Sequence, residues 1–332
     1  MRLGKVTIVA VSMLLMTVPA CAKPAPKSIP ELADEVRQVQ LSRVRSIDGG
    51  PGFSAYLYAY RSDGLKVHAL IAVPDGAAPE GGFPVLVANH GHHPEPPKYG
   101  ITADGKDWRP GDYYRRIPEL FAAKGFLVVM PDYRGHNSSE GLEFTGGMLE
   151  SRYYTADVLN LLAGLHSLQH ANSDHVFMWG HSMGGEVTLR TLVATDRVKG
   201  ASMWSSVGGD IWDQAYYYSR YEEPSAFDSS ETPKPAIDRL QDSVAALDGD
   251  FDYRESEPLL YLDRLITPIN IQHAVGDRSA AYKWSERLAK ELLMHGKSYA
   301  FHSYPGEDHL FSGPMLEQAV DRDAAFFREL MK

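Results

Sequence analysis

One stretch decides the fold, residues 175–194, which read HVFMWGHSMGGEVTLRTLVA. Its first part, VFMW, is apolar and β-rich, and its last part, EVTLRTLVA, has the composition of a helix. Between them Ser182 is framed by Gly180 and Gly184 in the pattern G-x-S-x-G. A serine on a tight strand-to-helix turn needs small residues two positions before and after it, because neighbouring chains come close there. The stretch therefore predicts a strand, a sharp turn that carries Ser182, and a helix.

Strand-like and helix-like segments alternate on both sides of this turn. Apolar runs predict further strands at 83–90, 126–133, 198–207, 269–277 and 298–306, and helices at 113–125 and about 149–170 separate some of them. Upstream, residues 53–60 and 65–73 are joined by RSDG, which predicts a hairpin. Continuous apolar strands separated by helices indicate an α/β fold with a mostly parallel sheet that is covered on both faces.

The segment from about 209 to 263 interrupts this alternation. It is polar, rich in Pro, Tyr and Asp, and falls between two predicted strands. Its length exceeds that of an ordinary connection, so we expect a cap inserted into the domain. This part of the chain is rich in aromatic rings, among them Trp204, Trp212 and Tyr217. The rings could contact an aromatic or sugar group of a substrate, or they could pack the cap onto the core.

The N-terminal residues have the pattern of a targeting segment. A basic start, MRLGK, precedes an uncharged apolar run at 6–18 that is short for a transmembrane helix, so we expect a signal peptide over residues 1–22. VPAC resembles a bacterial lipobox, which predicts lipidation of Cys21, whereas ACA at 20–22 is also a site for ordinary cleavage. We expect a periplasmic or lipid-anchored protein. The Pro-rich residues 23–45 are expected to form a leader or linker before a domain over 46–332.

Composition excludes some partners. The 332-residue chain has a formal net charge of −10 without a basic stripe, so it is not expected to bind nucleic acid. Its only cysteine is Cys21, so the mature domain has no intramolecular disulfide.

A nucleophilic serine needs a base, and the base needs an orienting acid. His309 follows the last predicted strand, and Asp277 ends the strand before it, which gives the order Ser182, Asp277, His309 along the chain. Asp308 is adjacent to His309, and adjacent side chains diverge, so it is badly placed to orient the ring. Asp210, after the strand at 198–207, is the alternative acid.

An oxyanion hole needs two N–H groups that point to one place. Met183, directly after the serine, and His92, after Gly91, are the expected backbone donors, and Tyr99 is a further hydroxyl candidate. His90, His92 and His93 could alternatively be zinc ligands. HGHH lacks the carboxylate and the HExxH spacing of such sites, so we expect neither a metal nor another cofactor.

These motifs together resemble a known family. Six motifs come in the order seen in the prolyl oligopeptidase-like branch of α/β-hydrolases, which includes dipeptidyl aminopeptidases and acylaminoacyl peptidases. They are NHG after a strand, PDYRGHNSSEG at 131–141, GHSMGG, SEPLLYLDRLITPI, GD and YPGEDH. The resemblance implies an α/β-hydrolase fold with Ser182 as nucleophile, Asp277 as acid and His309 as base. It also implies that Asp132 and Arg134 have a structural role.

Two departures from the family pattern affect the expected activity. Only a short leader precedes the hydrolase domain, where prolyl oligopeptidases have a propeller, and HGHHPEPP replaces a glycine-rich HGG loop. We therefore expect a secreted carboxylesterase that acts on a small ester through an acyl-enzyme. The alternatives are a serine peptidase acting on short peptides, a metal-dependent hydrolase and a non-catalytic binding protein.

Overall fold

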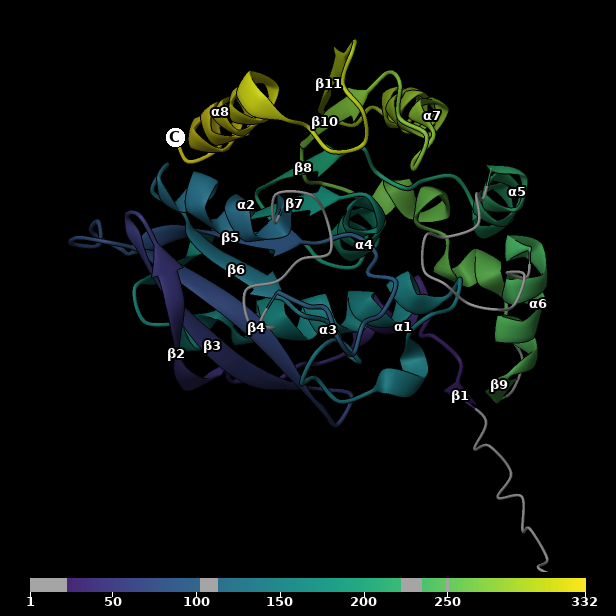
Figure 1. Ribbon diagram of the computed structural model, residues 1–332, viewed down its shortest axis with the longest axis horizontal. Helices are drawn as coiled ribbons and strands as arrows, with labels where there is room; N and C mark the ends of the chain where they lie inside the picture. The colour runs from purple at the N-terminus through teal and green to yellow at the C-terminus, as the bar shows by residue number, and fades with distance from the viewer. Residues whose placement is uncertain (1–22, 102–112, 222–234, 249–250) are drawn as a thin grey trace, which may run out of the picture.

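The computed structural model describes residues 23–101, 113–221, 235–248 and 251–332. The expected signal peptide and Cys21 lie outside the described residues. Most of the described chain is organised around a nine-stranded sheet with the order β11-β10-β8-β7-β5-β6-β4-β3-β2 (Figure 1). The strands of this sheet are β2 (Ser42–Gly50), β3 (Phe53–Ser62), β4 (Leu65–Pro74), β5 (Phe83–Asn89), β6 (Leu127–Pro131), β7 (Ala171–His181), β8 (Gly200–Trp204), β10 (Ile269–Ala274) and β11 (Tyr299–Tyr304).

Strand direction divides the sheet into two parts. From β11 to β6 the neighbouring strands are parallel, and they are the apolar runs that the sequence predicts as strands. β4, β3 and β2 add antiparallel strands at the other side of β6. The predicted hairpin is β3 and β4, which pair from Phe53↔Pro74 to Ser62↔Leu65. The chain therefore has the predicted α/β-hydrolase fold, with a mostly parallel central sheet.

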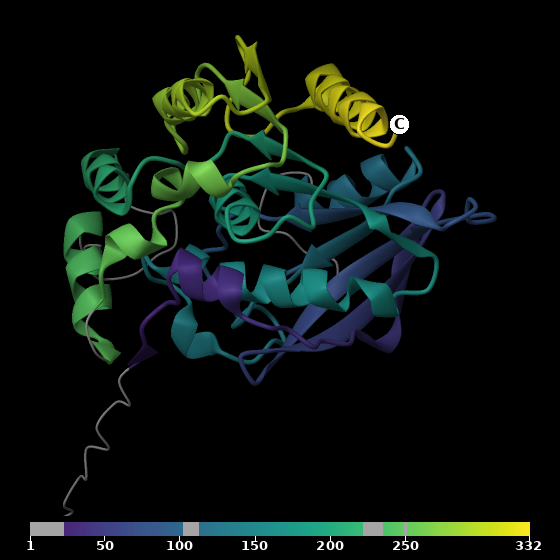
Figure 2. The ribbon, with the colours of Figure 1, turned by 180° about the vertical axis from the view of Figure 1, so that it is seen from behind.

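Helices cover both faces of the sheet, as Figures 1 and 2 show. The helices are α1 (Ile29–Asp34), α2 (Tyr113–Ala122), α3 (Glu150–Gly164), α4 (Met183–Leu192), α5 (Ile211–Tyr221), α6 (Ala236–Ala245), α7 (Tyr282–Met294) and α8 (Gly313–Glu329). One apolar cluster packs α2 and α8 on the sheet through residues such as Phe121 and Phe327. A second cluster packs α1, α3, α4 and α7 on the opposite face, with Val158 and Val187 at its centre. Burial on both faces explains why the central strands β5 and β6 are continuously apolar.

Residues 23–45, expected to be a leader or linker, contain ordered elements. Ser28 and Glu31 form a capping box at the start of α1, where the Glu31 carboxylate accepts from Ser28 N at 2.7 Å. Ile29 and Leu32 in α1 are fully buried. β1 (Lys23–Pro24) pairs with β9 (Leu247–Asp248). The capping box thus stabilises the start of α1, and two buried apolar side chains pack this segment on the domain, although its proline content resembles that of a linker.

The stretch from 209 to 263, expected to be a cap, carries α5 and α6, which lie together at one side of the molecule in Figure 1. A buried ion pair joins its C-terminal part to the main domain, where Arg152 Nη2 in α3 contacts Glu257 Oε1 at 2.5 Å.

Within the described ranges, no helix is both long enough and apolar enough to span a membrane.

Candidate active site

Ser182 lies on a sharp turn between β7 and α4. Its backbone has φ 57° and ψ −127°, which is a strained conformation for a residue with a side chain. Three backbone hydrogen bonds hold it there: Ser182 N donates to Trp204 O at 3.0 Å, and Ser182 O accepts from Gly185 N at 2.9 Å and from Val207 N at 3.0 Å. The strain is therefore imposed by β8 and by α4, as in a nucleophile elbow.

Two glycines allow neighbouring chains to approach this turn. A Cβ on Gly184 would collide with Asn89 O, at the end of β5. A Cβ on Gly91 would lie 2.9 Å from Ser182 Cβ and would also collide with the Tyr114 hydroxyl. The small residues of G-x-S-x-G and of NHG thus allow the loop after β5 to pass directly beside the serine.

Asp277 and His309 meet after β10 and β11. His309 Nδ1 is 2.8 Å from Asp277 Oδ2, and the Asp277 side chain is fully buried. Asp277 Oδ1 accepts from Ser279 N at 2.8 Å and from Ala280 N at 2.9 Å. Because a carboxylate only accepts, the proton of His309 lies on Nδ1 and the lone pair of the neutral ring lies on Nε2. This is the form in which an imidazole can act as a base.

Asp277 remains ionised although it is buried. Burial alone would raise its pKa, but hydrogen bonds from His273 and His309, the charge on His309 and the N–H of Ala280 together lower the pKa below its usual range. The side chain is thus available as a permanent negative charge beside the imidazole.

The other two aspartates considered from the sequence have different partners. Asp308 accepts a hydrogen bond from the backbone N–H of His309 at 2.7 Å. Asp210 accepts from Trp212 N and Asp213 N, both at 2.9 Å, at the start of α5. The geometry therefore places Asp277, and neither alternative, on the His309 ring.

A chain of hydrogen bonds joins the loops around Ser182. His181 Nε2 is 2.9 Å from His309 O, and the two rings have centroids 4.6 Å apart. Because the carbonyl accepts, His181 carries its proton on Nε2, and its Nδ1 accepts from the Tyr114 hydroxyl at 2.7 Å. That hydroxyl in turn accepts from Gly91 N at 2.7 Å. His181 and Tyr114 thus link the serine turn with the loop of His309 and the loop of Gly91.

Sequence reasoning missed Tyr114 and His181 as positioning residues. Tyr114, on α2, is 23 residues from Gly91 and 67 residues from His181 along the chain, so no sequence motif contains it together with its partners. The x position before a nucleophilic serine carries no residue requirement in the motif, so no local signal pointed to the role of His181.

The expected oxyanion donors belong to two segments next to Ser182, the start of α4 and the loop after β5. Met183 is the first residue of α4, so its N–H belongs to the positive end of the helix dipole. His92 follows Gly91, whose backbone lies against Ser182. The His92 side chain turns to α3, where its Nδ1 is 2.6 Å from Glu150 Oε1. Tyr99 lies beside His93, with ring centroids 6.1 Å apart.

The aromatic substrate candidates have different surroundings. Trp204 is fully buried in β8 and donates from Nε1 to Asp323 Oδ2 at 2.7 Å, so it is a core residue and not a substrate contact. Its position on β8, a strand whose residues are all buried, explains this correction. The Tyr217 hydroxyl donates to Arg278 O at 2.8 Å and thereby attaches α5 to the loop of Asp277. Trp212 is 41% exposed, which leaves it accessible to a ligand.

Arg134 has a structural position. Its Nη2 lies 2.8 Å from Asp157 Oδ1 and 2.8 Å from Asp63 Oδ2, and both Arg134 and Asp157 are buried. Burial alone would lower the pKa of Arg134, but the two carboxylates raise it above its usual value. This ion pair fixes the loop after β6 on α3.

Three features define a serine hydrolase of the α/β-hydrolase fold: the sheet order, the strained turn at Ser182, and the contact between Asp277 and the His309 ring in the loops after β10 and β11. Residues 113–332 match the model of the Prolyl oligopeptidase family. The chain therefore belongs to the prolyl oligopeptidase family. It is also similar to the uncharacterized peptidase YtmA of Bacillus subtilis (strain 168), with 27% identity over 258 residues that cover 77% of this chain and 86% of that protein.

Solved structures with the same fold include esterases and peptidases. Acetyl xylan esterase 1 from Thermoanaerobacterium sp. JW/SL YS485 aligns with a TM-score of 0.63 at 14% identity, over 93% of this chain and 96% of the esterase. A puromycin-hydrolyzing peptidase of Mycobacterium tuberculosis aligns with a TM-score of 0.61 at 22% identity, over 85% of this chain and 40% of the peptidase. At these identities the likeness extends to the fold alone.

Proposed function

We propose that Ser182, Asp277 and His309 form a catalytic triad that hydrolyses carboxylic esters through an acyl-enzyme. His309 Nε2 takes the proton of the Ser182 hydroxyl while Ser182 Oγ forms a bond to the ester carbonyl carbon. The tetrahedral intermediate collapses, and His309 returns that proton to the leaving alkoxide. Water then attacks the acyl-enzyme with His309 again as base, which releases the acid and restores Ser182. The observation that carries the proposal is the 2.8 Å contact between His309 Nδ1 and buried Asp277.

The proposed oxyanion hole consists of the backbone N–H groups of Met183 and His92. Met183 supplies the first N–H of α4, and His92 belongs to the loop that passes beside Ser182. A donor that points to the developing oxyanion contributes about 10²–10³-fold in kcat. The hydrogen bond from Gly91 N to Tyr114, 2.7 Å long, holds the backbone of this loop in place.

Ester substrates are favoured over peptides by the extent of the structural matches. The fold aligns with acetyl xylan esterases over nearly their whole chains, 96% and 92%, and with solved peptidases over 36% to 42% of theirs. A serine peptidase that acts on short peptides is the second candidate, because the family and YtmA carry that name.

A covalent probe tests the nucleophile. A fluorophosphonate should add one mass equivalent to the wild-type protein and none to Ser182→Ala. Ser206→Ala is a matched control, since its buried hydroxyl donates to Val207 O at 2.8 Å and has no assigned role. An unmodified wild-type protein with a normal thermal transition would contradict the proposal, as would equal labelling of Ser182→Ala.

Paired substrates separate the two candidate activities. A 4-nitrophenyl ester and the matching 4-nitroanilide of the same acyl group should be compared by kcat/KM, with aminoacyl and acetyl groups in parallel. An esterase is expected to turn over acetyl esters without measurable anilide cleavage. Cleavage of aminoacyl anilides would replace the esterase proposal with the peptidase.

We also propose that the chain is exported in a bacterium and anchored through a lipid on Cys21. The support is the sequence of residues 1–22, with its basic start, apolar run and VPAC motif. The mature protein should partition into detergent, and mass spectrometry should identify diacylglyceryl-Cys21 as its first residue. A soluble mature protein that begins after Cys21 would support ordinary cleavage instead.

A further inference from the structure

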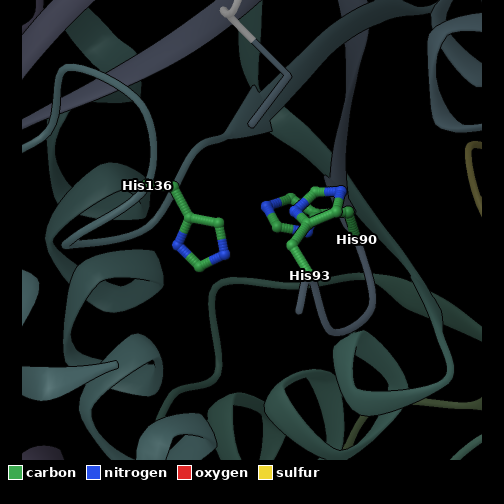
Figure 3. A group of neighbouring side chains, drawn as sticks. All are labelled: His90, His93 and His136. Carbon is green, nitrogen blue, oxygen red and sulfur yellow. The ribbon is translucent and has the colours of Figure 1, made fainter. Parts of the chain in front are cut away.

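Three buried histidines meet beside the loop of the proposed oxyanion hole. His90 and His93 come from the loop after β5, and His136 comes from the loop after β6. One ring nitrogen of each lies within 4.8 Å of the others, and all three residues are buried. Figure 3 shows the rings of His90 and His93 one over the other, with the ring of His136 facing them. His92, the third zinc ligand that the sequence offers beside His90 and His93, turns its side chain to Glu150 instead.

The hydrogen bond of the His136 ring leaves a nitrogen lone pair for a ligand. His136 Nδ1 lies 3.2 Å from Arg134 O. Since a carbonyl only accepts, Nδ1 carries the proton of the neutral ring, and the lone pair is on Nε2. His90 has a carbonyl near each ring nitrogen, Gly91 O at 2.8 Å from Nδ1 and Asp132 O at 3.4 Å from Nε2, and a neutral ring donates to only one of them. Histidines that bind metals commonly donate their other ring N–H to a backbone carbonyl in this way.

His136 Nε2 is the strongest indication of a missing ligand. It is buried, and it has no hydrogen-bond partner in the part of the chain that the structure describes. A buried ring nitrogen without a hydrogen-bond partner is a group that a metal ion would satisfy, and neutral imidazole is the form that coordinates a metal ion.

We propose that His90, His93 and His136 bind one divalent transition-metal ion of the zinc class. Three imidazoles without a carboxylate suit Zn²⁺ and its neighbours Co²⁺, Ni²⁺ and Cu²⁺ better than Mg²⁺ or Ca²⁺, which prefer oxygen ligands. Three protein ligands leave a fourth tetrahedral position for water. Bonds of about 2.0–2.1 Å require ligand nitrogens about 3.4 Å apart, so small side-chain movements would close the cluster around the ion.

The position of the cluster indicates what the ion would do. His90 and His93 flank Gly91 and His92, so an ion shared with His136 would tie the oxyanion loop to the loop after β6. The rings lie among aromatic side chains, with the His90 ring 4.4 Å from the Tyr133 ring and the His136 ring 5.4 Å from the Tyr154 ring. The ion would therefore fix the loop by joining these two loops. This proposal does not depend on the hydrolase reaction.

Metal binding by the full-length protein tests the proposal directly. After dialysis against a chelator, titration calorimetry with ZnCl₂ should give one tight site, and one equivalent of Co²⁺ should give the visible absorption bands of a tetrahedral nitrogen site. The thermal midpoint should rise with Zn²⁺. Failure of the folded wild-type protein to bind one equivalent of either ion would overturn the proposal.

Three variants locate the site. His136→Gln and His93→Gln should each weaken Zn²⁺ binding by more than about tenfold and abolish the Co²⁺ bands, because one of three ligands is lost. His295→Gln should bind as the wild type does, since His295 is an exposed residue at the end of α7, outside the cluster. Binding that persists unchanged in both cluster variants would assign the ion to another site. The chelated variants should keep the thermal midpoint of chelated wild type, and His93→Gln alone suffices if His136→Gln does not fold.

Discussion

Replacing Tyr114 by phenylalanine tests how the oxyanion loop is held. The Tyr114 hydroxyl accepts from Gly91 N and donates to His181 Nδ1, with both distances 2.7 Å, and the side chain is fully buried. Tyr114→Phe retains the ring and removes only the oxygen. The Gly91 N–H and the His181 ring nitrogen would then lose their shared partner in a place that solvent does not reach.

The expected cost follows from these two groups. A buried polar group left without its hydrogen bond costs about 1–3 kcal/mol, so the loss of two should lower the free energy of unfolding by about 2–6 kcal/mol. At about 2 °C per kcal/mol for a large domain, the thermal midpoint should fall by about 4–12 °C. The loop beside Ser182 would also be less restrained, and because one oxyanion donor contributes about 10²–10³-fold, we expect kcat to fall by about 10–100-fold with little change in KM.

Tyr60→Phe provides a matched control. Tyr60 is also buried, at 3% exposure, and its hydroxyl has no hydrogen-bond partner among the described residues. The same substitution there should leave the stability and the ester kcat/KM close to wild type. Urea unfolding and initial rates on a 4-nitrophenyl ester should be measured for both variants. If Tyr114→Phe is as stable and active as Tyr60→Phe, the hydroxyl does not hold the oxyanion loop.

Three further perturbations have expected outcomes. In the 4-nitrophenyl ester assay, Asp277→Asn should lower kcat by about 10⁴-fold, because an amide does not select the Nδ1–H form of His309. A much smaller decrease in kcat would indicate that another residue is the acid. The pKa of Asp277 is lower in the folded protein than its unfolded value of about 3.9. The ionised carboxylate therefore stabilises the fold above about pH 4, and this stabilisation is lost as the pH falls further. The difference in unfolding free energy between wild type and Asp277→Asn should accordingly shrink below about pH 4. Arg134→Met should cost about 3–5 kcal/mol in urea unfolding, because it leaves buried Asp157 unpaired, and the double variant Arg134→Met/Asp157→Leu should recover most of that loss.

The fold could be predicted from the sequence because its signals are local. Apolar runs such as 83–90 and 126–133 are continuous, since both faces of their strands are covered, and they contain β5 and β6. The turn at Ser182 is equally local, because the close approach of Asn89 O to Gly184 requires a glycine in the motif itself. The order of Asp277 and His309 follows from the order of the strands that precede them.

Features that depend on distant contacts could not be predicted in this way. The ordered α1 depends on burial of Ile29 and Leu32 against the domain, which its proline-rich composition conceals. Trp204 lies near other aromatic residues in the sequence, so a substrate contact and a packing role are both open from the sequence, whereas its direction on β8 is set by Asp323 on α8, which is 119 residues away. His136 lies more than 40 residues after His90 and His93 in the chain, so the sequence gives no indication that its ring lies beside theirs.

The loop after β5 shows why these distant contacts matter for the chemistry. In HGHH only Gly91 is small, and it is small because Ser182 and Tyr114 leave no room for a Cβ. A loop with bulkier residues on both sides of that glycine must be held from outside. The Tyr114 hydroxyl holds the Gly91 N–H from α2, Glu150 holds the His92 ring from α3, and His136 faces His90 and His93 from the loop after β6. Three separate elements thus hold the loop that carries His92, and this is the preorganisation that the proposed oxyanion donor requires.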